Sequence, residues 1–199
     1  MVSSEHAKTT LSRHLDDARQ AMLWKLEGLS EYDIRRPLTA HGTNLLGLVK
    51  HLIGCEIGYF GYVFNRPFPQ PPPWLAADEG GPTRDMWATA EESRHDIVDL
   101  YRRACAHSNT TIEALDLEAQ GNVPTWPEHL RAVTLHDILV HMLAETARHA
   151  GHADIVRELI DEAAGLHLDG DGLPEADAEY WPRLRTRIEF AAREADASG

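Results

Sequence analysis

VHMLAETARHAGH, residues 140–152, lies within a run from Thr134 to Asp161 that contains no proline and only one glycine. At the helical step of about 100° per residue, several side chains of this run share one face. They are Ile138, Met142, Thr146, Ala153 and Ile160. Thr134 is placed to cap such a helix, with Asp137 three positions on as a capping-box partner. The run therefore predicts one long amphipathic helix around which the fold is organised.

Two polar residues, Glu145 and His149, lie inside or beside this apolar face. Their spacing of four residues stacks the two side chains one helical turn apart. A carboxylate and an imidazole in apolar surroundings are costly unless they are paired or bound to a metal. The pair is therefore either a hydrogen-bonded pair or two ligands of a metal site. His141 and His152 fall at the edge of the face, as packed or surface histidines or as partners of the ligands, while Arg148 points away.

The composition indicates one acidic domain with a sizeable core. The chain has 199 residues, with 19 Lys and Arg against 32 Asp and Glu, and a formal charge of −13. This charge repels phosphate backbones, so we expect no nucleic-acid partner. No apolar run is long enough to span a membrane, and the N-terminal residues lack a signal pattern. Two cysteines, Cys55 and Cys105, make no disulfide framework, so we expect a soluble, reduced, cytoplasmic protein without a membrane partner.

Helical periodicity recurs along the chain. The predicted helices span 5–29, 44–64, 89–115 and 134–161, with a shorter helix over about 177–195. No strand pattern is found. Four long amphipathic helices with two long connections predict an all-α, antiparallel four-helix bundle. We assign residues 1–165 to this bundle and residues 166–199 to a C-terminal extension that carries the extra helix and packs on or beside the bundle. The oligomeric state is left open, a homodimer included.

The connections carry fewer signals. Residues 30–43 read as a connector, and residues 117–133 as a loop with Trp126. Residues 65–85 are rich in proline, which excludes helix there, and a loop of this length is either a lid or wall of a site or an ordinary surface segment. The acidic, glycine-containing turn 169–174 lacks the final glutamate of a calcium loop.

The helix predicted over 44–64 supplies a third polar candidate. His51 lies at the edge of its apolar stripe, with Cys55 one turn on. Four glycines lie to one side of His51, at Gly47, Gly54, Gly58 and Gly61. Each costs about 1 kcal/mol of helix propensity against alanine. They either leave room for a ligand beside His51 or permit close packing of another element. His51 and Cys55 could also form a two-ligand pair, although a free cysteine of this kind is usually plain packing.

Two segments resemble a known family. TNLLGLVKHL, residues 43–52, and ETARHAGHADIVRE, residues 145–158, resemble the DinB-like four-helix metalloproteins, and most closely the branch related to the metal-binding domain of mycothiol-dependent maleylpyruvate isomerase. The resemblance covers roughly the first 160 residues and implies a metal site. Its ligands are implied to be His51 from the second long helix, with Glu145 and His149 from the fourth. Plain DinB proteins usually carry His in place of Glu145.

The implied chemistry follows from this ligand set. Two imidazoles and one carboxylate suit zinc, with nickel or another first-row metal as alternatives. The resemblance implies mycothiol or a similar thiol as cosubstrate, whose thiolate would attack a small electrophile in a detoxification or stress role. A metal-dependent thiol S-transferase is the first hypothesis. A non-catalytic metal-binding DinB-like protein and a helical protein with a hydrogen-bonded His–Glu pair are the alternatives.

Overall fold

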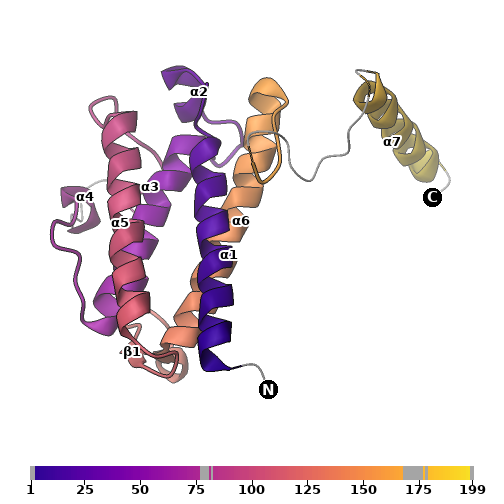
Figure 1. The fold of residues 1–199 in the computed structure, drawn as a ribbon. Helices are drawn as coiled ribbons and strands as arrows, with labels where there is room; N and C mark the ends of the chain where they lie inside the picture. The colour runs from indigo at the N-terminus through magenta and orange to yellow at the C-terminus, as the bar shows by residue number, and fades with distance from the viewer. Residues whose placement is uncertain (1–2, 77–80, 82, 168–176, 178, 198–199) are drawn as a thin grey trace.

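Four long helices form the body of the protein in a computed structural model that describes residues 3–76, 81, 83–167, 177 and 179–197 (Figure 1). They are α1 (Ser4–Trp24), α3 (Leu45–Glu56), α5 (Arg94–Ala114) and α6 (Leu135–Asp161). Helix α1 packs against α6, and α3 packs against both α5 and α6. This arrangement confirms the predicted all-α, DinB-like antiparallel bundle. Because α3 and α6 are neighbours, residues far apart in sequence meet between them.

Side-chain caps set where the long helices begin. Ser3, Asn44, Ser93 and Thr134 each accept a hydrogen bond from a backbone N–H of the first turn, which satisfies donors that have no partner within the helix. The predicted capping box of Thr134 and Asp137 is confirmed. The expected start of the third long helix at residue 89 was wrong. That helix begins at Arg94, because Ser93 is its cap and Glu92 is engaged by the Thr89 N–H.

The second long helix changes its winding after Glu56. Residues Ile57–Gly61 form a π-helical turn, Tyr62–Phe64 a 3₁₀ turn, and Asn65 ends the segment at φ 54°. A Cβ at Gly61 would lie 3.3 Å from the carbonyl oxygen of Arg66, so the returning chain passes close to this glycine. The segment predicted as helix over 44–64 is therefore helical throughout, with three different pitches.

Short elements fill the connections. They are α2 (Glu31–Arg35), α4 (Pro73–Ala76), β1 (Gln120–Asn122), η3 (Glu128–Leu130) and β2 (Ala132–Thr134). Strands β1 and β2 pair antiparallel, with Gly121 opposite Val133. The expectation of no strand was therefore wrong, because three-residue strands are too short to show an alternating pattern. The exclusion of helix from residues 65–85 was also wrong, since a single turn can begin at a proline such as Pro73.

A buried ion pair crosses the apolar core between α1 and α3. Arg19 donates from Nε and Nη2 to the two carboxylate oxygens of Glu56, at 2.7 and 2.6 Å, and both side chains are almost completely buried. Its remaining terminal nitrogen donates to Asp16 and to Asn109 of α5. The pair thus joins three of the four long helices through fully satisfied polar atoms.

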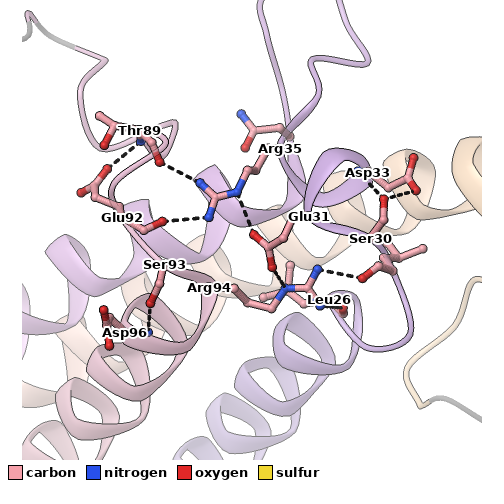
Figure 2. A network of polar contacts seen from close by, with 12 residues as sticks. Leu26, Ser30, Glu31, Asp33, Arg35, Thr89, Glu92, Ser93, Arg94 and Asp96 are labelled. Atoms are coloured by element: carbon pink, nitrogen blue, oxygen red, sulfur yellow. Dashed lines mark hydrogen bonds and ion pairs between the residues drawn. The ribbon is translucent and has the colours of Figure 1, made fainter.

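A second polar network fixes the chain that precedes α5 (Figure 2). Arg35 of α2 donates to the carbonyl oxygens of Thr89 and Glu92, each at 2.8 Å. Lys50 of α3 donates to the Glu92 carboxylate and to the carbonyl oxygen of Trp87. Residues 87–92 are therefore held against both α2 and the first half of α3.

Helix α7 (Tyr180–Ala197) stands apart from the bundle (Figure 1). Every one of its residues is exposed or half-exposed. Packing of residues 166–199 on the bundle therefore remains a prediction, and the acidic turn at 169–174 lies outside the described residues. Within the described part of the chain, no helix has the length and apolar character needed to cross a membrane.

Candidate metal centre

The three predicted ligands converge between α3 and α6. Glu145 Oε1 lies 3.3 Å from His51 Nε2 and 3.0 Å from His149 Nε2. One ligand atom from each residue can be chosen so that all three lie within 4.8 Å of one another. The two imidazole rings meet edge to face, with centroids 4.9 Å apart. Packing of α3 against α6 thus brings His51 next to Glu145 and His149, which are one turn apart on α6.

The orientation of His51 is set from its other side. Its Nδ1 lies 2.7 Å from Oδ2 of Asp85, in the segment that precedes α5. A proton on Nδ1 that is donated to Asp85 leaves the Nε2 lone pair directed at Glu145 and His149. A carboxylate behind a metal-binding histidine is a recurring arrangement, because it fixes the tautomer and the ring orientation. Sequence reasoning missed Asp85, which lies in a loop without periodicity.

The environment favours the protonation states that bind metals. Burial lowers the pKa of His149, and the nearby His51 acts in the same direction. A neutral imidazole is the form that coordinates a metal. Burial opposes ionisation of Glu145, but the hydrogen bonds and charges of His51 and His149 outweigh it and lower the pKa of this carboxyl group. The donor set is therefore two imidazole nitrogens and one carboxylate oxygen.

Cys55 lies close to the triad but has the wrong chemistry for a nucleophile. Its Sγ is 3.4 Å from His51 Nε2. Burial raises the pKa of this thiol strongly, and the negative charges of Glu145 and Glu56 add to the effect. The thiol is consequently protonated at neutral pH, whereas thiolate is the reactive form.

The glycines beside His51 serve two different purposes. A Cβ at Gly47 would lie 1.9 Å from the carbonyl oxygen of Met86, so only glycine lets the segment carrying Asp85 approach α3. A Cβ at Gly58, by contrast, would meet nothing within 4 Å. Leu75 of the proline-rich loop faces Gly54. Close approach therefore involves loop backbone at Gly47 and the Leu75 side chain at Gly54, while nothing approaches Gly58.

An aromatic cluster lies near the ligands and includes His141, which precedes Glu145 by one turn of α6. The rings of Tyr59, Trp126 and His141 have centroids 4.5 to 5.9 Å apart, and Trp126 Nε1 lies 3.3 Å from the Tyr59 hydroxyl. The strands β1 and β2 flank the loop that carries Trp126, and the π turn carries Tyr59. Of the remaining candidates, His152 is exposed and touches the His149 ring at a centroid distance of 5.4 Å, and Arg148 is exposed.

The residues present fit a divalent metal by two observations. The Nε2 atoms of His51 and His149 face the same carboxylate oxygen of Glu145. The other ring nitrogen of His51, Nδ1, is already engaged by Asp85. In addition, Nδ1 of His149 is buried without a hydrogen-bond partner, so Nε2 is the nitrogen of this ring that has a neighbour. Two histidines and one carboxylate make the ligand set of several catalytic zinc sites, which keep a further position open.

The bundle and the His–Glu–His cluster between its second and fourth long helices define the DinB-like class of four-helix proteins. Within this class, a family model described as mycothiol-S-transferase matches residues 10–162. The chain belongs to the mycothiol-S-transferase family. Searches of curated proteins and of solved structures found no match. The matched residues include the whole candidate site and leave out α7.

Proposed function

We propose that this protein transfers mycothiol, or a closely similar small thiol, onto a small electrophile in a reaction that requires a divalent metal. The convergence of His51, Glu145 and His149 is the observation that carries the proposal, and membership of the family supplies the thiol. Zinc is the first choice of metal, because two imidazoles and a carboxylate suit it, and nickel or another first-row ion is the alternative.

The metal would supply one chemical function. When bound, it would lower the pKa of a coordinated thiol, so that the thiolate is available at neutral pH. In the transfer, the S–H bond of the thiol breaks and a bond forms between its sulfur and the electrophilic atom. The electrophile either expels a leaving group with the electron pair of the broken bond, and the thiol proton is released, or it takes up a proton in an addition.

The side chains of the protein hold and shape the site. Asp85 accepts from the imidazole of His51 and keeps its Nε2 directed at the centre. The apolar surroundings that raise the pKa of Cys55 keep that thiol protonated, so the protein offers no competing thiolate of its own there. A Cβ at Gly58 would meet nothing within 4 Å, and this open position is where we expect the substrate to enter.

Metal content tests the first half of the proposal. We expect the full chain, purified with metal present, to hold one divalent ion per chain, and a His51→Ala, His149→Ala double variant to hold none. Arg148→Ala is the matched control, because Arg148 adjoins His149 but is exposed and points away. Equal metal content in the double variant and the control would favour the reading in which Glu145 and His149 are a hydrogen-bonded pair.

Turnover tests the second half. Mycothiol and a chromogenic electrophile are incubated with the metal-loaded chain, with His149→Ala and with Arg148→Ala, and rates are corrected for the uncatalysed reaction. We expect activity only in the wild type and in Arg148→Ala. A metal-loaded chain without activity would leave the non-catalytic metal-binding protein as the better description, and activity that survives chelation would point to Cys55.

A further inference from the structure

Helix α7 has an apolar face that no part of the described chain covers. At 100° per residue, seven side chains fall within an arc of about 120° that contains no charge. They are Tyr180, Trp181, Leu184, Ile188, Ala191, Ala192 and Ala195. Ile188 is 61% exposed and Trp181 is 44% exposed. A helix with such a face and no packing of its own gains stability only from a partner.

The outer face of α6 carries a matching apolar stripe. Side chains at steps of three and four run along the side of α6 opposite to its core face. They are Val140, Ala144, Ala147, Gly151, Ile155 and Leu159, all of them exposed. Two exposed charged residues, Arg148 and Glu158, fall within the same arc. Ile155 and Leu159 are 62% and 63% exposed, and a Cβ at Gly151 would meet nothing within 4 Å. The small side chains in the middle of this stripe permit close approach of another helix.

The charges around the apolar faces of α7 and α6 are complementary when the two helices run antiparallel. The first half of α7 carries Arg183, Arg185 and Arg187 and no acid, in a chain whose formal charge is −13. Glu158 lies within the C-terminal end of the α6 stripe, and Glu162 is the C-cap residue that follows it. Antiparallel docking of α7 on α6 therefore places the arginines at these carboxylates, and it aligns opposite ends of the two helix dipoles.

We propose that α7 docks on the α6 stripe of a second copy of this chain, so that two copies exchange their C-terminal helices reciprocally. The exit from α6 favours exchange over docking within one chain. The carbonyl oxygens of Gly165 and Leu166 accept hydrogen bonds from Lys25 and from Trp24 Nε1. The chain that leaves α6 is thus held at α1, on the side of α6 away from the stripe.

A membrane is the other surface that a basic amphipathic helix can bind. The acidic bundle would repel an anionic bilayer, and a bilayer would leave the α6 stripe uncovered. A second copy covers the apolar face of α7 together with the C-terminal part of the α6 stripe, and it forms two identical interfaces under twofold symmetry.

The molar mass of the full chain tests the proposal. Sedimentation equilibrium over a range of protein concentrations should show a monomer–dimer equilibrium. Ile188→Glu should raise the dissociation constant by at least about 30-fold, the effect of losing a central interface residue. Phe190→Glu is the matched control: Phe190 is 60% exposed on the same helix but lies off the apolar face, and this variant should dimerise as the wild type does. A monomer at every concentration would overturn the proposal.

Mixing variants tests the exchange itself. Ile188→Glu disables α7 and Leu159→Glu disables the α6 stripe, so each variant alone should be monomeric. An equimolar mixture retains one intact interface and should recover heterodimers. Absence of recovery, or a compact monomer in which Trp181 is protected from fluorescence quenchers and becomes accessible in Leu159→Glu, would show docking within one chain and overturn the exchange. Binding to anionic vesicles that Ile188→Glu abolishes, without dimers in solution, would assign α7 to a membrane surface.

Discussion

Two carboxylates on the long helices, Glu56 and Glu145, face nitrogen donors across a helix interface in very different ways. Glu56 is completely buried, and both of its oxygens accept hydrogen bonds from the guanidinium of Arg19. The Glu145 side chain is 26% exposed, and only Oε1 faces His51 and His149. One carboxylate is paired with a permanent cation, and the other with imidazoles.

The Glu56–Arg19 pair stabilises the fold, whereas the Glu145 cluster belongs to the candidate metal site. Arginine stays charged at every pH a protein meets, so the Glu56 pair is complete without help. Burial lowers the pKa of His149, so the charge of Glu145 is not balanced by a fixed partner. The Glu145 cluster therefore suits a positive ion from outside, and changes at the two carboxylates should affect different properties of the protein.

The largest effect on stability is expected at the core pair. Glu56→Ala leaves the Arg19 guanidinium buried without its partner, which should lower the free energy of unfolding by about 3–5 kcal/mol. Urea unfolding measures it. Asp16→Ala is the control, because it removes a half-exposed partner of the same arginine and should cost less than about 1 kcal/mol. Similar losses in both variants would contradict the distinction between the two carboxylates.

Metal removal should have the next largest effect, at the other carboxylate. A ligand that binds only the folded state stabilises it by about 2.7 kcal/mol at a free concentration of 100 times Kd. Chelation should therefore lower the Tm of the wild type and leave the Tm of His149→Ala unchanged. The bundle should remain helical by circular dichroism, because its core does not depend on the metal. Unfolding on chelation would show that the site is structural.

Loss of the contact behind His51 should be smaller again. Asp85→Asn removes the charged acceptor of the imidazole and should weaken metal affinity about 10- to 100-fold, measured by competition with a chromogenic chelator. Asp99→Asn on the exposed face of α5 is the control and should leave affinity unchanged. An unchanged affinity in Asp85→Asn would mean that His51 is oriented by packing alone.

The smallest effect is expected at the start of α6, at a distance from both carboxylates along the chain. Thr134→Ala removes the cap and should cost about 1 kcal/mol at neutral pH. Hydrogen bonds from Thr134 lower the pKa of Asp137, so this carboxylate stabilises the folded state above its unfolded pKa and loses that effect as the pH falls below about 4. The difference in Tm between variant and wild type should therefore narrow in acid, and a constant difference would contradict the role of Asp137.

Features that follow from helical periodicity over a long segment were predictable from the sequence. The four long helices, the cap at Thr134 and the meeting of His51 with Glu145 and His149 all follow from apolar spacing combined with the family resemblance. Glu145 and His149 were visible because polar side chains stand out in an apolar stripe.

Features that depend on distant contacts were not predictable. Asp85 reaches His51 only because Gly47 lets the Met86 carbonyl approach α3. Glu56 sits in a run of mainly apolar residues, and nothing local identifies Arg19 as its partner. The strands β1 and β2 pair only when the chain between them folds back, and three residues are too few to show a period.

The separation of His51 and Glu145 along the chain has a consequence in time. The two residues are 94 positions apart, and at ribosomal rates of about 5–20 residues per second this is roughly 5 to 20 seconds of synthesis. A nascent chain therefore carries His51 long before the other two members of the triad exist. The three ligands are therefore together only after α6 has been made, so we expect the ion to slow the opening of the finished protein and not to guide the folding of the earlier helices.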